Sequence, residues 1–190
     1  VSPGHRQRAT LRKGCLLLAA GLLALASHRV HASCADILPA SGPPPAGTAR
    51  EVKPDDILRL RDIGQPDGSM FGQPSPLGIS PNGKQVAFVL NRAAPASNSY
   101  CRALVVIDLN GPANPRILDQ GGELITSIVT IRGIRSDNGF PALVTPVWSP
   151  DGRWISWLRR DNGLTQVWRA RANGTRGEAV TRSATDITDV

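Results

Sequence analysis

The scarcity of histidine excludes several kinds of catalytic and metal site in this sequence. The 190 residues contain three, His5, His28 and His31, and none follows position 32. Without an imidazole, residues 33–190 lack the base of a self-contained Ser-His-Asp or Cys-His site and a common ligand of zinc. The Gly-x-Ser-x-Gly pattern of a nucleophile turn is also missing. We therefore expect no catalytic, metal-binding or cofactor-binding residue in this chain, and no cofactor.

Acidic residues are absent from residues 1–32, which carry five bases. The whole chain has 22 Lys and Arg against 15 Asp and Glu. Without this leader, 17 bases face the same 15 acids, a net charge of +2. The basic character therefore belongs to the leader, and the remaining chain has no charge excess that indicates nucleic-acid binding.

The order of residues in this leader is that of a secretory signal peptide. A basic stretch precedes twelve apolar residues at 15–26, and small side chains follow at Val30 and Ala32. Twelve helical residues span about 18 Å, less than the roughly 30 Å of a hydrocarbon core. We expect residues 1–32 to be a signal peptide cleaved near Ala32, and no membrane association afterwards. An uncleaved anchor and lipidation at Cys34 are the alternatives.

This signal peptide predicts a periplasmic or secreted protein. The first residue is Val1 rather than Met, which fits an alternative start codon and hence a bacterial source.

Cysteine is also rare, and two residues, Cys34 and Cys101, follow the leader. They form no Cys-x-x-Cys motif, so a zinc or redox site has no support. In an oxidising compartment the two are a candidate disulfide. The alternative is two unpaired small apolar side chains.

Residues 33–76 are predicted to be a Pro-rich linker and a segment that leads into the first folded unit. Residues 39–54 include three consecutive prolines and no apolar period, which is typical of an extended linker. Residues 54–64 fit either a short helix capped by Asp55 or Asp56, or a strand.

An internal repeat occupies most of the remaining chain. The aligned turn residues of its two copies are Ser80, Pro81, Asn82 and Gly83 in the first, and Ser149, Pro150, Asp151 and Gly152 in the second. Proline presets the first corner of such a turn, and Asx and Gly tolerate the tight corner that follows. Strand-like runs flank the turn, and each copy continues to an Asn-Gly turn and a last short run. Each copy therefore predicts four antiparallel strands.

Four short strands per repeat predict an all-β fold, here a partial β-propeller. We expect an incomplete propeller domain at 77–190, with about two four-stranded blades at 77–121 and 143–182. The β-prone insertion at 122–142 predicts an added strand or hairpin, and residues 186–190 predict the start of a third blade. The first copy has six extra residues, which we place in a loop at 91–102. Propellers close with four to eight blades, so we expect the chain to be the N-terminal part of a longer protein.

The repeat unit resembles the blades of TolB-type proteins and of the prolyl oligopeptidase (S9) family of serine peptidases. Further segments are similar to the lasso-peptide isopeptidases, the astexin-type enzymes of proteobacteria. These segments are residues 98–101, 121–123 and 148–170, whereas residues 60–64 resemble the entry segment of the secreted dipeptidyl-peptidase-like branch of the S9 family. The resemblance covers residues 54–190. It implies that the propeller precedes a C-terminal α/β-hydrolase domain that carries the Ser, Asp and His and lies outside this chain.

The resemblance also implies the function. The whole protein would be an exported serine peptidase that hydrolyses the isopeptide bond of a lasso peptide, with the propeller gating substrate access. Its partner would be a peptide, bound with the help of the missing hydrolase domain. The alternative is a non-catalytic, TolB-like periplasmic propeller that binds proteins.

The four tryptophans all lie in the second copy, at Trp148, Trp154, Trp157 and Trp168. We expect them to pack between blades rather than to stack on a substrate, with Trp154 and Trp157 on opposite faces of one strand. Arg159 and Arg160 could bind a peptide carboxylate, but a solvated strand end is the favoured interpretation. Glu123 has no assigned role.

Overall fold

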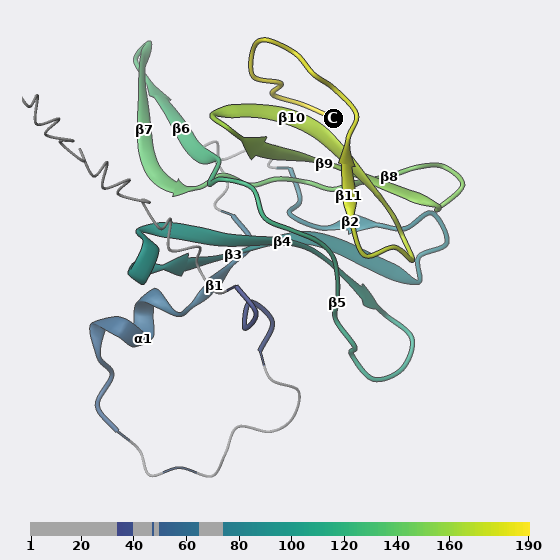
Figure 1. The fold of residues 1–190 in the computed structure, drawn as a ribbon, viewed down its shortest axis with the longest axis horizontal. Helices are drawn as coiled ribbons and strands as arrows, with labels where there is room; N and C mark the ends of the chain where they lie inside the picture. The colour runs from purple at the N-terminus through teal and green to yellow at the C-terminus, as the bar shows by residue number, and fades with distance from the viewer. Residues whose placement is uncertain (1–33, 40–46, 48–49, 65–73) are drawn as a thin grey trace, which may run out of the picture.

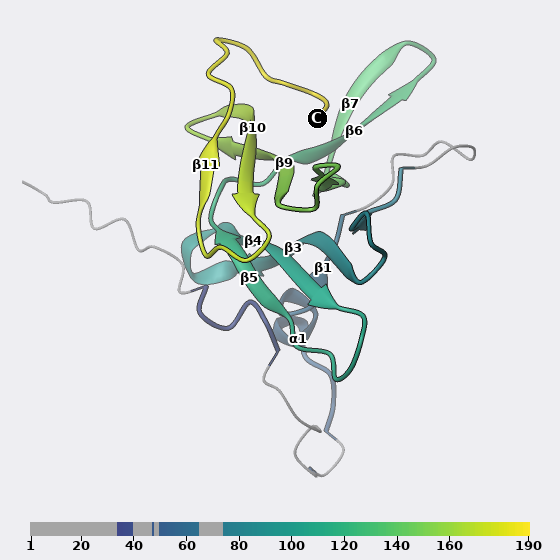
Figure 2. The ribbon, with the colours of Figure 1, turned by 90° about the vertical axis from the view of Figure 1, so that its right-hand side faces the viewer.

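The computed structural model describes residues 34–39, 47, 50–64 and 74–190. The predicted signal peptide and its cleavage site lie outside these residues. Two antiparallel sheets lie one above the other (Figures 1 and 2), and the expectation of an all-β fold is confirmed. No helix in the described part of the chain is long and apolar enough to cross a bilayer.

Each copy of the repeat forms one sheet. The strands of the first sheet follow the order β1-β3-β4-β5, with β2 also paired to β3; those of the second follow β11-β10-β9-β8. In the first sheet the bounds are β1 Arg61–Asp62, β2 Gly78–Ile79, β3 Gln85–Ala94, β4 Ser99–Asp108 and β5 Arg116–Gln120. In the second they are β8 Val147–Trp148, β9 Trp154–Asp161, β10 Leu164–Arg171 and β11 Gly177–Ala179. The number of propeller blades stays a prediction.

The placing of the six extra residues of the first copy in a loop at 91–102 is wrong. Strand β3 continues to Ala94, and β4 pairs with it from Ser99 onward. A short 3-10 helix, η1 (Pro95–Ser97), and Asn98 at φ 46° make the connection. The extra residues therefore lengthen the hairpin, because β3 and β4 pair with each other as far as Ala94 and Ser99.

The insertion forms a hairpin, as the sequence indicated, from β6 (Thr126–Ile131) and β7 (Ile134–Pro141). These strands pair with each other and with no other described strand. In Figure 1 the hairpin projects from the two sheets at the upper left. Its tip exposes 65% of Ile131 and 72% of Ile134.

The prediction of a strand at residues 186–190 is wrong, since the structure assigns no strand there. Ile187 N–H donates to the carbonyl of Thr165 at 2.9 Å. This single backbone bond to β10 is too little to build a strand ladder.

The main core lies between the two sheets. Alternate residues of β3, β4 and β5 face one side of the first sheet and meet the inward residues of β8, β9 and β10. Trp148 and Trp157 are both buried in this core. The indole N–H of Trp148 donates to the carbonyl of Gly78 at 2.9 Å, which ties β8 to β2. The two repeats are therefore one packed body rather than two separate units.

The opposite face of the first sheet is covered by residues 34–39. Ile37 is fully buried there against Leu90, Cys101 and Val105. Arg61 of β1 donates to the carbonyls of Ile37 and Asp36 at 2.6 and 2.7 Å. The start of the predicted linker is thus part of the fold, because one large apolar side chain at this point finds an apolar face to cover.

Residues 54–64 contain both of the elements that the sequence left open. Helix α1 (Pro54–Leu58) is followed by β1. The N-cap is Lys53 and not Asp55 or Asp56; the Asp56 side chain accepts a hydrogen bond from the Lys53 N–H at 2.9 Å. An acid in the first turn can satisfy an N–H group in this way without being the cap.

A disulfide joins Cys34 to Cys101, with a Cα–Cα distance of 5.5 Å. It attaches residues 34–39 to β4 across 67 residues of sequence. We expect the Cys34→Ser chain to be about 2–4 kcal/mol less stable than the oxidised wild type, because the bridge restricts the unfolded chain. Thermal unfolding measured with and without a reducing agent checks this: the wild type should lose stability on reduction and the variant should not. Equal melting temperatures for the oxidised wild type and the variant would contradict it.

Candidate functional site

The two predicted repeat turns have nearly the same geometry. In the first, the Ser80 hydroxyl donates to Asn82 Oδ1 at 2.8 Å and accepts from Gln85 N–H at 2.9 Å. Gly83 closes the turn at φ 67°, a conformation that glycine adopts without strain. Pro81 occupies the preceding corner.

In the second turn, the Ser149 hydroxyl donates to Asp151 Oδ1 at 2.6 Å and accepts from Trp154 N–H at 3.0 Å. Gly152 again has φ 67°, and a Cβ built on it would lie 3.8 Å from the ring of Pro81. The two turns therefore lie close to each other. The hydrogen bond from Ser149, with help from the Arg153 N–H, lowers the pKa of Asp151 to about 2. These side chains serve the turns, and neither serine has a basic partner that would activate it as a nucleophile.

A junction between the sheets is built on Gly121, Gly122 and Glu123, directly after β5. Both glycines have positive φ angles, 121° and 89°. A Cβ on Gly122 would lie 2.9 Å from the side chain of Arg159, and one on Gly121 would lie 3.0 Å from it. The two glycines therefore allow Arg159 to cross the backbone at short range.

Glu123, which the sequence left without a role, belongs to this junction. Its N–H donates to the carbonyl of Arg160 at 2.6 Å, and its Oε2 accepts from the N–H of Gly163 at 3.0 Å. Arg160 also pairs with Asp186 at 3.1 Å. Glu123 thus connects the end of the first sheet to the β9–β10 hairpin of the second.

Asp119 and Arg159 form a buried ion pair across the same junction. Asp119 is 6% exposed, and its Oδ2 lies 2.5 Å from Nη1 of Arg159. Its other oxygen accepts from the N–H of Gly177 at 2.9 Å. Arg159 also pairs with Asp161 at 2.8 Å and stacks over the ring of Trp168 at 4.1 Å. The expectation of a solvated strand end is therefore wrong for Arg159, because in-chain carboxylates hold it at the junction.

A second buried cation lies next to this pair. Arg102 is 3% exposed, donates from Nε to Asn91 Oδ1 at 2.9 Å, and donates from Nη1 to the Glu123 carbonyl at 2.7 Å. Burial, with the nearby Arg159 cation, lowers the pKa of Arg102 to about 10. It is still charged at neutral pH. Nothing in the local sequence distinguishes it from a surface arginine.

The tryptophans divide between the two faces of the second sheet. Trp148 and Trp157 pack between the sheets as expected, and Trp168 packs partly against the same core. Trp154 lies on the opposite face of β9, half-buried, with the guanidinium groups of Arg169 and Arg171 at 4.4 and 4.6 Å from its ring. The opposite faces of Trp154 and Trp157 are thus as predicted, and the packing of Trp154 against a further blade stays a prediction.

The described residues hold no group of three or more His, Cys, Asp or Glu side chains placed to bind a metal ion. Their conspicuous clusters are instead the ion-paired junction and a cavity of about 970 Å³ beside β11. This arrangement can hold two sheets together and bind a ligand at an edge. It offers no paired nucleophile and base.

Comparison with known proteins gives a partial match. No family model matches the chain. It is 34% identical over 148 residues to the lasso peptide isopeptidase AtxE2 of Asticcacaulis excentricus, which covers 76% of this chain and 21% of that protein. The chain therefore spans about a fifth of the length of this relative.

Solved structures of AtxE2 isopeptidase agree with this match. A variant with Astexin3-dC4 bound superposes with a TM-score of 0.65 and 33% identity, over 74% of this chain and 22% of that one. The apo form gives 0.64 and 32%, over 73% and 21%. The resemblance inferred from the repeat and its flanking segments is thus confirmed: the chain is homologous to the lasso peptide isopeptidase AtxE2 over a part of that protein, as expected for an N-terminal portion.

Proposed function

We propose that this chain is the N-terminal β-propeller portion of an exported serine peptidase that hydrolyses the isopeptide bond of a lasso peptide. The observation that carries the proposal is the homology with AtxE2 in both sequence and fold. The stacking of two four-strand repeats through a shared apolar core supports a propeller, because neighbouring blades pack in this way.

The chemistry must come from residues outside this chain. Residues 33–190 contain no histidine, and the 190 residues contain no Gly-x-Ser-x-Gly sequence. In the proposed whole protein, a serine of a following hydrolase domain attacks the isopeptide carbonyl, and the N-terminal amine of the peptide takes up a proton and leaves; water then hydrolyses the acyl-enzyme and releases the side-chain carboxylate. The propeller part gates access of the folded peptide to that serine.

Export is part of this proposal. The order of residues in the leader supports removal of residues 1–32 and a periplasmic or secreted location. The bond between Cys34 and Cys101 fits the same compartment, because disulfides persist where the surroundings are oxidising.

The proposal is tested by sequencing the genomic DNA beyond the codon for Val190 and expressing the complete product for export. We expect further Ser-Pro-Asp-Gly repeats and then a Gly-x-Ser-x-Gly sequence. The complete product should convert a lasso peptide to a linear form that is heavier by one water, as seen by mass spectrometry, and its mature N-terminus should be Ser33. The 190-residue chain alone, used as the control, should leave the peptide intact.

Two results would count against the proposal. Repeats followed by a stop codon would favour the TolB-like protein-binding propeller. Turnover by the 190-residue chain itself, abolished by a serine-reactive inhibitor, would show that the catalytic serine lies within it.

A further inference from the structure

A cavity of about 970 Å³ follows the outer edge of β11 in the second sheet. Strand β11 is the terminal strand of that sheet, so its outer edge has no strand partner among residues 74–190. The lining includes two tryptophans, Trp154 and Trp168, and the five arginines Arg159, Arg169, Arg171, Arg176 and Arg182. An open strand edge is a template on which another extended chain can pair.

The cavity takes side chains from both faces of the sheet. Trp168 pairs with Ala179 of β11 and shares its face, where Arg159 lies 4.1 Å over the indole. The other face carries Trp154, flanked by Arg169 and Arg171. Each side of the edge therefore offers an aromatic ring with cations beside it.

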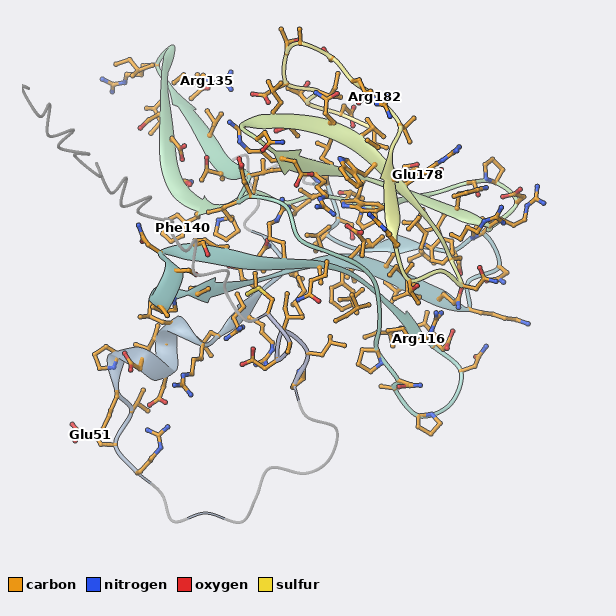
Figure 3. The ribbon with its side chains drawn as sticks, in the orientation of Figure 1. Glu51, Arg116, Arg135, Phe140, Glu178 and Arg182 are labelled. Carbon is orange, nitrogen blue, oxygen red and sulfur yellow. A yellow bond between two sulfur atoms is a disulfide. The ribbon has the colours of Figure 1, made fainter. Side chains whose placement is uncertain are left out.

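Most of this positive charge is not neutralised by acids of the described residues. The acids of the lining are Asp119 and Glu178, and each already pairs with an arginine: Asp119 with Arg159 at 2.5 Å, and Glu178 with Arg169 at 2.8 Å. The other three arginines, Arg171, Arg176 and Arg182, have no acidic partner in the described part of the chain. All three are exposed. Figure 3 shows Glu178 and Arg182 along the same C-terminal stretch, on the side of the molecule where β11 lies.

We propose that this edge binds an extended, acidic peptide segment that adds to β11 as a further strand. Successive side chains of a strand point to opposite faces of a sheet. An added strand would therefore direct its side chains alternately to the Trp168 face and to the Trp154 face. Carboxylates on that strand match the guanidinium groups that lack an acidic partner among the described residues, since arginine binds carboxylate through two parallel hydrogen bonds.

The available backbone groups make the acidic side chains the main source of affinity. The N–H of Gly177 already donates to Asp119, and the N–H groups of Val180 and Thr181 donate back to the Val167 carbonyl. The new pairing is therefore short and centred on Ala179. A neutral strand would gain little affinity from this pairing. An acidic strand also gains affinity from its electrostatic attraction to the three arginines.

The inference does not depend on the proposed catalytic function and is tested on the full 190-residue chain. The probe is a fluorescein-labelled octapeptide of alternating Glu and Val, and binding is measured by fluorescence anisotropy at low salt. We expect saturable binding that weakens as ionic strength rises. A Lys-Val octapeptide of the same length should not bind. The Glu-Val peptide with alternate amides N-methylated should bind more weakly, because those amides no longer donate to a strand.

Charge-reversal variants locate the site. Arg176→Glu with Arg182→Glu should weaken binding at least about tenfold, because two attractions become repulsions. Both side chains are exposed, and neither forms an ion pair with a described residue, so the melting temperature should not change. Arg132→Glu with Arg135→Glu, an equal charge change at the tip of the β6–β7 hairpin, is the matched control and should bind like the wild type.

Three results would overturn the inference. Equal binding of the Lys-Val peptide would remove the charge argument, and unchanged affinity in the double variant would place the peptide elsewhere. A stable dimer that the Glu-Val peptide does not dissociate would assign the β11 edge to a second copy of the chain.

Discussion

Replacement of Gly78 by alanine is expected to unfold most of the chain at temperatures where the wild type is folded. Gly78 is buried in β2, next to β8 of the second sheet. A Cβ at this position would lie 2.0 Å from the carbonyl oxygen of Pro146. That oxygen belongs to the backbone, so no rotamer change relieves the contact. The β2–β8 junction and the hydrogen bond from Trp148 to Gly78 would both have to shift.

The expected cost of Gly78→Ala is about 4 kcal/mol or more, with a fall in melting temperature on the order of 10 °C. Circular dichroism during heating measures it. Gly83→Ala is the matched control five residues away. There φ is 67° and no atom lies within 4 Å of the new Cβ, so the cost should be limited to about 1–2 kcal/mol of backbone strain. Similar losses for the two variants would mean that the close approach to Pro146 does not exist in solution.

Removal of the Asp119 carboxylate is expected to be nearly as damaging. Asp119→Ala leaves the Gly177 N–H without its acceptor and leaves Arg159, 15% exposed, with Asp161 as its remaining ion-pair partner. Breaking one side of a buried pair costs about 3–5 kcal/mol, because the remaining charge stays out of water. Urea unfolding of the two chains measures this loss.

The matched control for Asp119→Ala is Glu178→Ala. Glu178 pairs with Arg169 at 2.8 Å, but both side chains are about half exposed. Exposed pairs contribute at most about 1 kcal/mol. Asp119→Asn adds a second comparison, since its amide oxygen still accepts from Gly177 while the charge is lost. If Asp119→Ala costs no more than Glu178→Ala, the junction does not depend on the buried ion pair.

The repeat made much of this fold predictable from the sequence. The turns at Ser80 and Ser149 recur with the same hydrogen bonds because Ser, Pro, Asx and Gly determine such turns locally. The β-prone run before Gly133 likewise predicted an added strand or hairpin, and a hairpin is present. Local chemistry is sufficient for features of this kind.

The parts that could not be predicted depend on contacts between distant residues. Ile37 is one apolar residue in a Pro-rich stretch, and its burial depends on the face that β3 and β4 present. Arg102 and Arg159 carry the same charge as exposed arginines, and their burial is decided by Glu123 and Asp119. Gly78 is ordinary in sequence, yet Pro146, 68 positions later, requires it to be glycine. No periodicity or short motif encodes such pairings.

The isolated position of the β6–β7 hairpin offers a practical site for labels. Its strands pair with each other and with no other described strand, and its turn, at Arg132 and Gly133, has open space around the glycine. Exposed loop tips of this kind accept inserted residues without disturbing the elements behind them. An epitope tag or a fluorophore placed between Arg132 and Gly133 would therefore label the folded chain while the hydrogen-bond ladders of both sheets stay intact.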